Sequence, residues 1–186
     1  MNTKTVQKLL KNSYQGKNKT SLIDGYNIDT NLSGNRAQVY FNNDTKKAVI
    51  VHRGTQGVQD FITDGLMNLG IKTNRFKHAE EVQNKAINKY GKDNLLTLGH
   101  SLGGTLAETY NKGGQTITLN KPVLLQDINK RIGDNQTDIK TSNDPVSFLR
   151  QYQDGNKAVN IPSNSKSLLT EHKTDTLGRI DKTIEF

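Results

Sequence analysis

The residues of this sequence best suited to chemistry centre on a serine that stands between two glycines. Residues 99–103 read Gly-His-Ser-Leu-Gly, with Ser101 in the middle. Residues 95–98 before it can form a short apolar strand, and residues 102–110 after it can form a helix. Flanking glycines remove Cβ atoms where strand and helix crowd, so the serine can sit on a strained turn with its hydroxyl exposed. The pattern predicts a serine nucleophile, and a plain glycine-rich turn is the alternative.

A serine hydroxyl attacks a substrate only when a base removes its proton, and an acid must orient that base. Where the serine sits on such a turn, the order along the chain is serine, acid, histidine. His172 is the only histidine that follows Ser101. This order makes His172 the base, and the alternative is a solvated histidine between its charged neighbours.

Asp144 is the acid that we expect to orient this base. It follows a candidate strand and precedes a proline, so it lies where that strand ends. Catalytic groups of open α/β sheets collect at the carboxyl ends of strands. The alternative role for Asp144 is an ordinary Asx turn. The other carboxylates of this stretch are Glu108, Asp127, Asp134, Asp138, Asp154 and Glu171.

An ester hydrolase also needs N–H donors for the oxyanion of its tetrahedral intermediate. Leu102 begins the helix after the serine, where amides have no partner within the helix. The second donor should come from a loop after a neighbouring strand, and residues 53–55, Arg-Gly-Thr, fit that description. We expect the five donors of Arg53 to hold this loop in place. His100 should point away from the reacting centre.

Strand and helix patterns alternate around these residues. Residues 36–42 and 47–52 flank an Asn-Asp turn and are typical of a β-hairpin. Apolar residues at intervals of three and four predict an amphipathic helix over residues 76–90. The alternation predicts an α/β fold with a mostly parallel sheet and helices on its faces. Further expected elements are a short helix at 6–10 and strands at 116–119, 138–142 and 158–161.

Length and composition narrow the possible classes of protein. A chain of 186 residues predicts a single domain over residues 1–186. The absence of cysteine excludes disulfides, thiolate zinc sites and a cysteine nucleophile, and four histidines make a histidine-rich metal site an unfavoured interpretation. No apolar run approaches the length of a membrane span, and residues 1–12 lack the apolar region of a signal peptide. We expect a soluble protein, either cytoplasmic or associated with a virion.

Four blocks of sequence carry a family resemblance. They read VIVHRGT at 49–55, DFITD at 60–64, GHSLGG at 99–104 and NDPV at 143–146. Together they resemble the class 3, or fungal-type, lipase family. The short, cysteine-free form is similar to lipase-like proteins of large DNA viruses and of virophages of protists. The resemblance implies an α/β-hydrolase of reduced size.

The same resemblance assigns roles to individual residues. It implies a triad of Ser101, Asp144 and His172, oxyanion donors at Thr55 and Leu102, and no metal or cofactor. The implied substrate is a lipid ester, either a triacylglycerol or a phospholipid. The alternative from another class is a lipase fold kept as a non-catalytic binding or virion structural protein.

The net charge of +8 favours an anionic partner. The sequence carries no nucleic-acid-binding motif, so we expect peripheral contact with an anionic membrane surface instead. Residues 57–77, which follow the oxyanion loop, combine apolar residues with cations and are expected to form a cover over the site. The alternative is that their apolar residues complete the core. The cationic cluster at the end of this stretch is Lys72, Arg75, Lys77 and His78.

Overall fold

A computed structural model describes residues 1–56, 74–112, 114–153, 155 and 157–180 of the chain. Its centre is an eight-stranded sheet in which the strands follow one another in chain order, β1 to β8. The antiparallel part contains β1 (Leu22–Ile23), β2 (Tyr26–Ile28), β3 (Ala37–Asn42) and β4 (Ala48–His52). The parallel part continues from β4 with β5 (Leu95–His100), β6 (Gln115–Leu119), β7 (Gln136–Thr141) and β8 (Ala158–Ile161).

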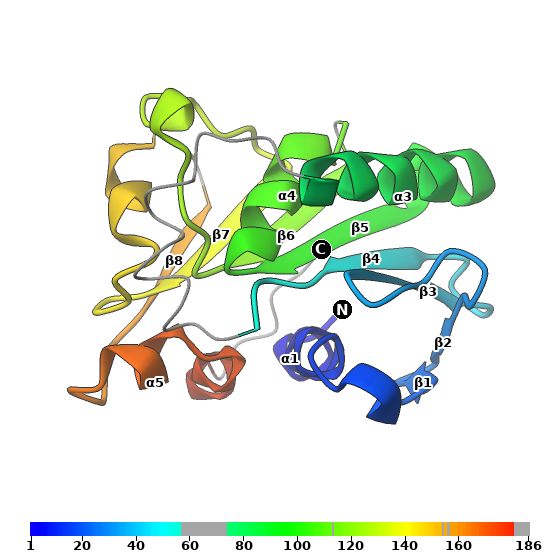
Figure 1. Cartoon of the computed structure of the whole chain (residues 1–186), viewed down its shortest axis with the longest axis horizontal. Coiled ribbons are helices and arrows are strands. Elements are labelled where there is room, and N and C mark those ends of the chain that lie inside the picture. Colours follow the sequence, from blue (N-terminus) through cyan, green and yellow to red (C-terminus); the bar gives the residue numbers. More distant parts are fainter. Residues whose placement is uncertain (57–73, 113, 154, 156, 181–186) are drawn as a thin grey trace.

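Helices cover both faces of this sheet (Figure 1). On one face lie α3 (Asn74–Tyr90) and α4 (Leu102–Tyr110), which connect the parallel strands. On the other face lie α1 (Thr3–Asn12) and α5 (Leu168–His172). This arrangement confirms the predicted α/β-hydrolase class. The short 3₁₀ helices are η1 (Gly16–Asn18), η3 (Lys92–Asn94), η4 (Leu125–Asp127), η5 (Phe148–Tyr152) and η6 (Thr174–Arg179).

The alternation of side chains along β5 shows how the two layers are held. Leu96 and Leu98 are buried in the same cluster as Leu9 of α1, whereas Leu95 is buried in a second cluster with Ala86 of α3. Successive side chains of a strand point to opposite faces of the sheet. The leucines of β5 therefore pack against helices on both faces.

A buried group of charges ties α4 to the far half of the sheet. Lys121, after β6, is 1% exposed and pairs with Glu108 of α4 and, at 3.0 Å, with Asp138 of β7. Arg150 of η5 also binds Asp138. Burial would raise the pKa of Asp138, but the charges of Lys121 and Arg150 lower it below the ordinary value. Glu108 and Asp138 are therefore committed to a structural network and not to His172.

Most sequence expectations for the elements are confirmed. The predicted hairpin is β3 and β4, which pair Ala37 with His52. The helix predicted over residues 76–90 is α3 and begins two residues earlier. Strands expected at 116–119, 138–142 and 158–161 correspond to β6, β7 and β8. Of the proposed cover, residues 57–73 lie outside the described part of the chain.

Candidate active site

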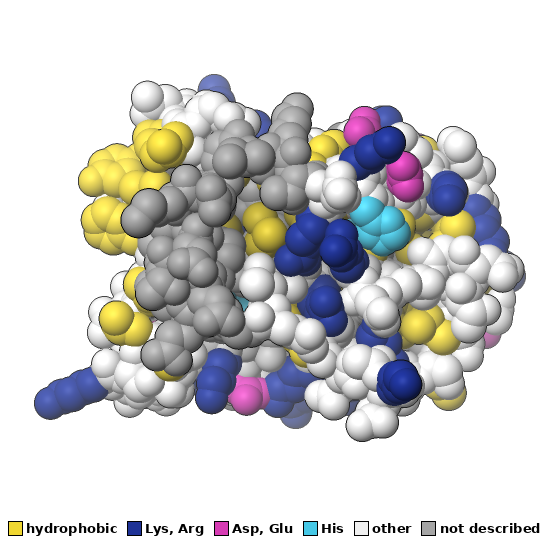
Figure 2. Space-filling model, in the orientation of Figure 1, with side chains coloured by type: hydrophobic (Ala, Val, Ile, Leu, Met, Phe, Trp, Pro, Cys, Tyr) yellow, Lys and Arg dark blue, Asp and Glu magenta, His cyan; other side chains and the backbone are white. Residues whose placement is uncertain are grey.

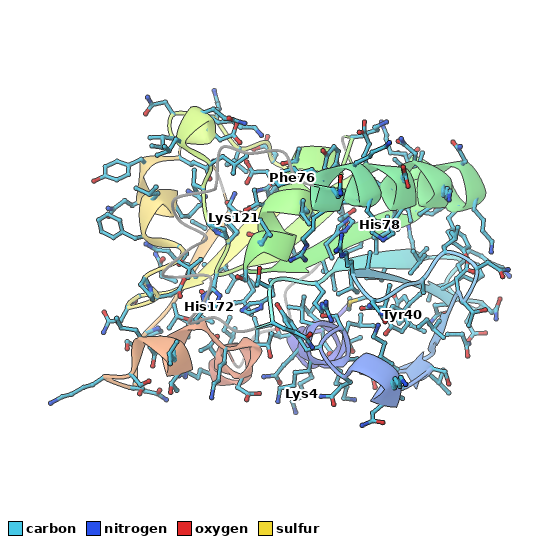
Figure 3. The ribbon with its side chains drawn as sticks, in the orientation of Figure 1. Lys4, Tyr40, Phe76, His78, Lys121 and His172 are labelled. Carbon is cyan, nitrogen blue, oxygen red and sulfur yellow. The ribbon has the colours of Figure 1, made fainter. Side chains whose placement is uncertain are left out.

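The predicted site residues come from four different strand ends. Thr55 follows β4, Ser101 follows β5, Asp144 follows β7 and His172 comes after β8 at the end of α5. Since β4 to β8 are parallel, their carboxyl ends lie along one edge of the sheet, where α/β folds bind their ligands. Figure 3 labels His172 at the end of α5, at this edge of the sheet.

Ser101 occupies a backbone conformation that is rare for a residue with a side chain. Its φ is 56° and its ψ is −136°, and such conformations cost about 1–3 kcal/mol each. A Cβ at Gly99 would overlap the backbone of Gly103, and a Cβ at Gly103 would overlap the carbonyl of His52. The two glycines let strand, turn and helix approach closely enough to hold the serine in this strained position.

His172 and Asp144 form a direct, fully buried pair. Nδ1 of His172 lies 2.6 Å from Oδ1 of Asp144, and both side chains have no exposed surface. A carboxylate only accepts hydrogen bonds, so Nδ1 carries the proton. Oδ2 of Asp144 accepts from the N–H of Ser147 at 2.7 Å, which fixes the carboxylate. When the imidazole is neutral, its other nitrogen, Nε2, is therefore the acceptor.

This nitrogen, Nε2 of His172, is buried and makes no hydrogen bond within the described part of the chain. The structure thus joins the histidine to the aspartate but gives no hydrogen bond between the histidine and Ser101. Such bonds are often long before substrate binds. Nε2 is thus left for a further partner, and the backbone of His172 is bound by His100, the residue before Ser101.

The backbone around His172 is held by two side chains that the sequence analysis did not select. Asn120, after β6, donates from Nδ2 to the carbonyl of Glu171 at 2.9 Å and accepts at Oδ1 from the N–H of Thr141. His100 approaches the carbonyl of His172 with Nε2 at 2.6 Å. Asn120, after β6, and His100, at the end of β5, therefore hold the backbone that carries His172.

The loop after β4 is fastened by an arginine other than the one predicted. Arg75, in the first turn of α3, donates to the carbonyls of Arg53 and Gly54 and to the Oγ1 of Thr55. The buried Nε of Arg53 has no hydrogen-bond partner among the described residues. The donors that the structure places on these two loop carbonyls come from Arg75 at the start of α3.

The predicted oxyanion donors lie on both sides of the serine. A Cβ on Gly54 would stand 2.8 Å from the Cβ of Ser101, so the loop passes directly beside the serine. Leu102 begins α4 immediately after it, and the first amides of a helix have no partner within the helix. The described geometry is compatible with amide donors from Thr55 and Leu102.

His100 precedes Ser101, and the centroid of its ring lies 4.9 Å from that of the His172 ring. Both ring nitrogens are occupied, by Tyr14 Oη and by the carbonyl of His172. Burial, and then the charge of nearby His172, lower the pKa of His100 to about 3. The ring is therefore neutral at physiological pH and acts through hydrogen bonds alone.

The described residues contain no group of three or more His, Asp or Glu side chains able to hold a metal ion. Nor does any described helix have the length and apolar character needed to cross a membrane.

Comparison with solved structures identifies the fold. The Lip2 lipase from Yarrowia lipolytica superimposes with a TM-score of 0.55 at 16% identity, over 85% of this chain and 78% of that chain. A triacylglycerol lipase from Penicillium expansum gives 0.53 at 16% identity, over 86% and 77%. Rhizomucor miehei lipase gives 0.52 at 18% identity, over 77% and 61%. At these identities the likeness concerns the fold alone.

Comparison of sequences identifies the family. No curated protein sequence matches the chain. A family model for a phospholipase-like protein, the Tle-like phospholipase domain, matches residues 4–160. This range contains Ser101 and Asp144 and ends before His172, whose contact with Asp144 is given by the structure. With most of its length matched, the chain belongs to the Tle-like phospholipase domain family.

Proposed function

We propose that the protein is a serine hydrolase that cleaves lipid esters through Ser101, Asp144 and His172. The single observation that carries this proposal is the buried histidine whose Nδ1 binds Asp144 at 2.6 Å while its Nε2 has no partner in the described chain. An imidazole held in this tautomer can only act through Nε2 as an acceptor, which is the state a serine requires of its base.

The reaction follows from the roles of these groups. His172 takes the proton of Ser101 Oγ while Oγ attacks the ester carbonyl, and the amides of Thr55 and Leu102 bind the oxyanion. His172 then gives its proton to the leaving alcohol, which leaves an acyl-serine. Water, deprotonated by the same nitrogen, attacks the acyl group, and His172 returns this proton to Ser101 Oγ as the fatty acid is released. Asp144 stabilises the imidazolium in both halves of the cycle.

A fluorophosphonate probe with mass mapping of the labelled peptide tests this proposal. We expect label on Ser101 and hydrolysis of p-nitrophenyl butyrate by the unmodified protein. Ser101→Ala should lose both, with a residual rate of roughly 10³- to 10⁴-fold over water from binding and oxyanion contacts. Ser13→Ala is the matched control, because Ser13 is also fully buried but lies at the end of α1.

Two results would contradict it. Equal hydrolysis by the unmodified protein and by Ser101→Ala would exclude this serine as the nucleophile. An unlabelled, inactive but folded protein would favour the alternative of a non-catalytic lipase-fold binding or virion structural protein. The proposed likeness to proteins of large DNA viruses and virophages, and the cytoplasmic or virion-associated location, stay predictions from the sequence.

We also propose that the active-site end of the molecule rests on an anionic lipid surface. Lys19, Arg36 and Arg53 have no ion-pair partner in the described chain. Arg36 and Arg53 are neighbours in the sheet, since the backbone N–H of Arg53 donates to the carbonyl of Arg36 at 3.0 Å. Burial lowers the pKa of Arg75 to about 10, and the charges of Arg53 and Arg36 add to this effect. Lys19, Arg36 and Arg53 form a cationic patch next to the oxyanion loop, without an ion-pair partner among the described residues.

Exposed apolar side chains occur at the same end of the sheet. Leu125 of η4 is 68% exposed, and Phe148 and Tyr152 of η5 are 57% and 53% exposed. Both helices follow carboxyl ends of parallel strands. Figure 2 shows Lys and Arg side chains near the middle of this face and hydrophobic side chains at its left edge. Apolar area combined with cations is the pattern of proteins that bind at a lipid interface.

Co-sedimentation of Ser101→Ala protein with liposomes tests the surface. We expect binding to phosphatidylserine vesicles that falls with salt, and about a fivefold loss when one cation such as Arg36 is replaced by Gln, since each contributes about 1 kcal/mol. Phe148→Ser should also weaken binding. Lys92→Gln and Leu22→Ser, at the opposite end and far edge of the sheet, are the controls. Equal binding to neutral and anionic vesicles would refute the electrostatic part.

A further inference from the structure

Tyr14, just after α1, joins the oxyanion loop to the turn that carries the serine. Its Oη accepts a hydrogen bond from the N–H of Gly54 at 3.0 Å and lies 2.7 Å from Nδ1 of His100. The other nitrogen of His100 faces a carbonyl oxygen of His172, so it must carry the proton. Nδ1 is then an acceptor, and Tyr14 donates its hydroxyl proton to it.

One chain of hydrogen bonds results. It runs from the N–H of Gly54 to Tyr14, from Tyr14 to His100, and from His100 to the backbone of His172. Each donor has one acceptor, and no proton is left over. The chain connects the loop that should bind the oxyanion with the residue that should act as base, and it passes through the residue next to the serine.

The same loop is held from the opposite side by Arg75. The peptide unit between Arg53 and Gly54 has its carbonyl bound by Arg75 and its N–H bound by Tyr14. In a trans peptide these two groups point in opposite directions, so the plane is fixed at both ends. The next carbonyl, of Gly54, also accepts from Arg75 at 3.3 Å. The N–H of Thr55 belongs to that unit and is thereby turned away from α3.

We infer that Tyr14 is a positioning residue for ester hydrolysis: through Gly54 and His100 it fixes the oxyanion donor of Thr55 relative to the base His172. Tyr14 does not touch the reacting atoms in this assignment. It lowers the freedom of the loop before the transition state forms, and preorganised donors of this kind are where acyl-transfer enzymes gain much of their rate. The inference rests on the proposed hydrolysis at Ser101.

The chain keeps one protonation state over the working range of an enzyme. Burial raises the pKa of Tyr14 to about 12, and burial lowers the pKa of His100 to about 3. Between these limits the phenol stays protonated and the imidazole stays neutral. The hydrogen bonds therefore keep their direction, as a positioning element requires.

Tyr14→Phe tests the inference, because it removes only the hydroxyl. Loss of a whole oxyanion donor lowers kcat by about 10²–10³, and a donor that is present but less firmly placed should cost less, about 10- to 100-fold. We expect that loss in kcat for p-nitrophenyl butyrate, an unchanged KM, and an equal fall in the rate of fluorophosphonate labelling.

Tyr40→Phe is the matched control. Tyr40 is also a buried tyrosine whose hydroxyl is bound by a residue of α1, accepting from Nδ2 of Asn12 at 2.7 Å, but it lies away from the site. Both variants should lose similar thermal stability, and only Tyr14→Phe should lose kcat. Equal kcat values, within twofold, would overturn the inference and leave Tyr14 a structural residue. A raised KM with unchanged kcat would also overturn it.

His100→Gln provides a second test from the other side of the contact, since a glutamine amide retains a donor for the carbonyl of His172. If Tyr14 and His100 act as one chain, the double variant should be no slower than the slower single variant. Multiplying losses would show separate roles and contradict the inference. Failure of the proposed function is distinguishable, because the unmodified protein would then show neither labelling nor turnover.

Discussion

Two buried histidines should make the fold of this protein sensitive to mild acid. Burial lowers the pKa of His52 to about 4 and that of His100 to about 3, both from 6.5. In the unfolded chain both rings take up protons as the pH falls below about 6.5. The folded protein does not take them up until about pH 4 and 3, so between these limits the unfolded state binds more protons and is favoured.

The size of the effect follows from these values. At pH 5 each ring favours unfolding by about 2 kcal/mol, because that is the free energy of protonating a group of pKa 6.5 at this pH. Together they should lower the free energy of unfolding by about 4 kcal/mol relative to pH 8, against a total that is typically about 5–15 kcal/mol. Carboxylates with lowered pKa values, such as Asp138, add their own loss mainly below the ordinary carboxyl pKa of about 4.

Urea unfolding followed by far-UV circular dichroism at pH 8 and pH 5 measures this difference. His52→Phe should reduce it by about 2 kcal/mol, because a ring of similar size cannot be protonated. His78→Asn is the control, since His78 lies on α3 and is partly exposed. A difference below about 1 kcal/mol for the unmodified protein, or an unchanged difference in His52→Phe, would refute the reasoning.

Three further substitutions give separate predictions. Asp144→Asn should lower kcat for p-nitrophenyl butyrate by up to about 10⁴-fold with little change in thermal unfolding, because the amide favours the wrong tautomer of the histidine. Lys121→Met should cost about 3–5 kcal/mol in urea unfolding, since two buried carboxylates lose their shared cation. Gly103→Ala should prevent stable folding, as judged by circular dichroism, because its Cβ would overlap the carbonyl of His52. Gly34→Ala, where a Cβ meets open space, should not.

The parts of the fold that the sequence predicts are those fixed by local constraints. The serine between two glycines needs a strand before it and a helix after it, and the structure supplies β5 and α4 there. Asp144 could be selected because a strand, a turn and a proline follow one another directly. Its contact with His172 follows from chain order and from the convergence of strand ends, both of which are rules of topology.

Contacts between residues that are far apart in the sequence have no local sequence pattern from which they could be predicted. Tyr14 and His100 are 86 positions apart in the chain and meet only because α1 packs under the end of β5. Lys121 is charged and would be placed on the surface by composition alone, yet it is 1% exposed because two carboxylates surround it. The sequence assigns Arg75 only to a cationic cluster, and its hydrogen bonds to the carbonyls of Arg53 and Gly54 become visible in the folded chain alone.

There is a physical reason why the sequence predicts the proposed reactive residues but not the residues that position them. Ser101 and His172, the proposed nucleophile and base, could be selected from the sequence because their residue types are those that the proposed chemistry requires. The residues that hold them are ordinary in type, and their role lies in direction: Asn120 and His100 bind two successive carbonyls around the base, and Tyr14 fixes the loop opposite. A catalytic position defined to a fraction of an ångström needs such fixed partners. In a small fold they must come from the neighbouring strand ends and from α1, because these are the elements that reach the site.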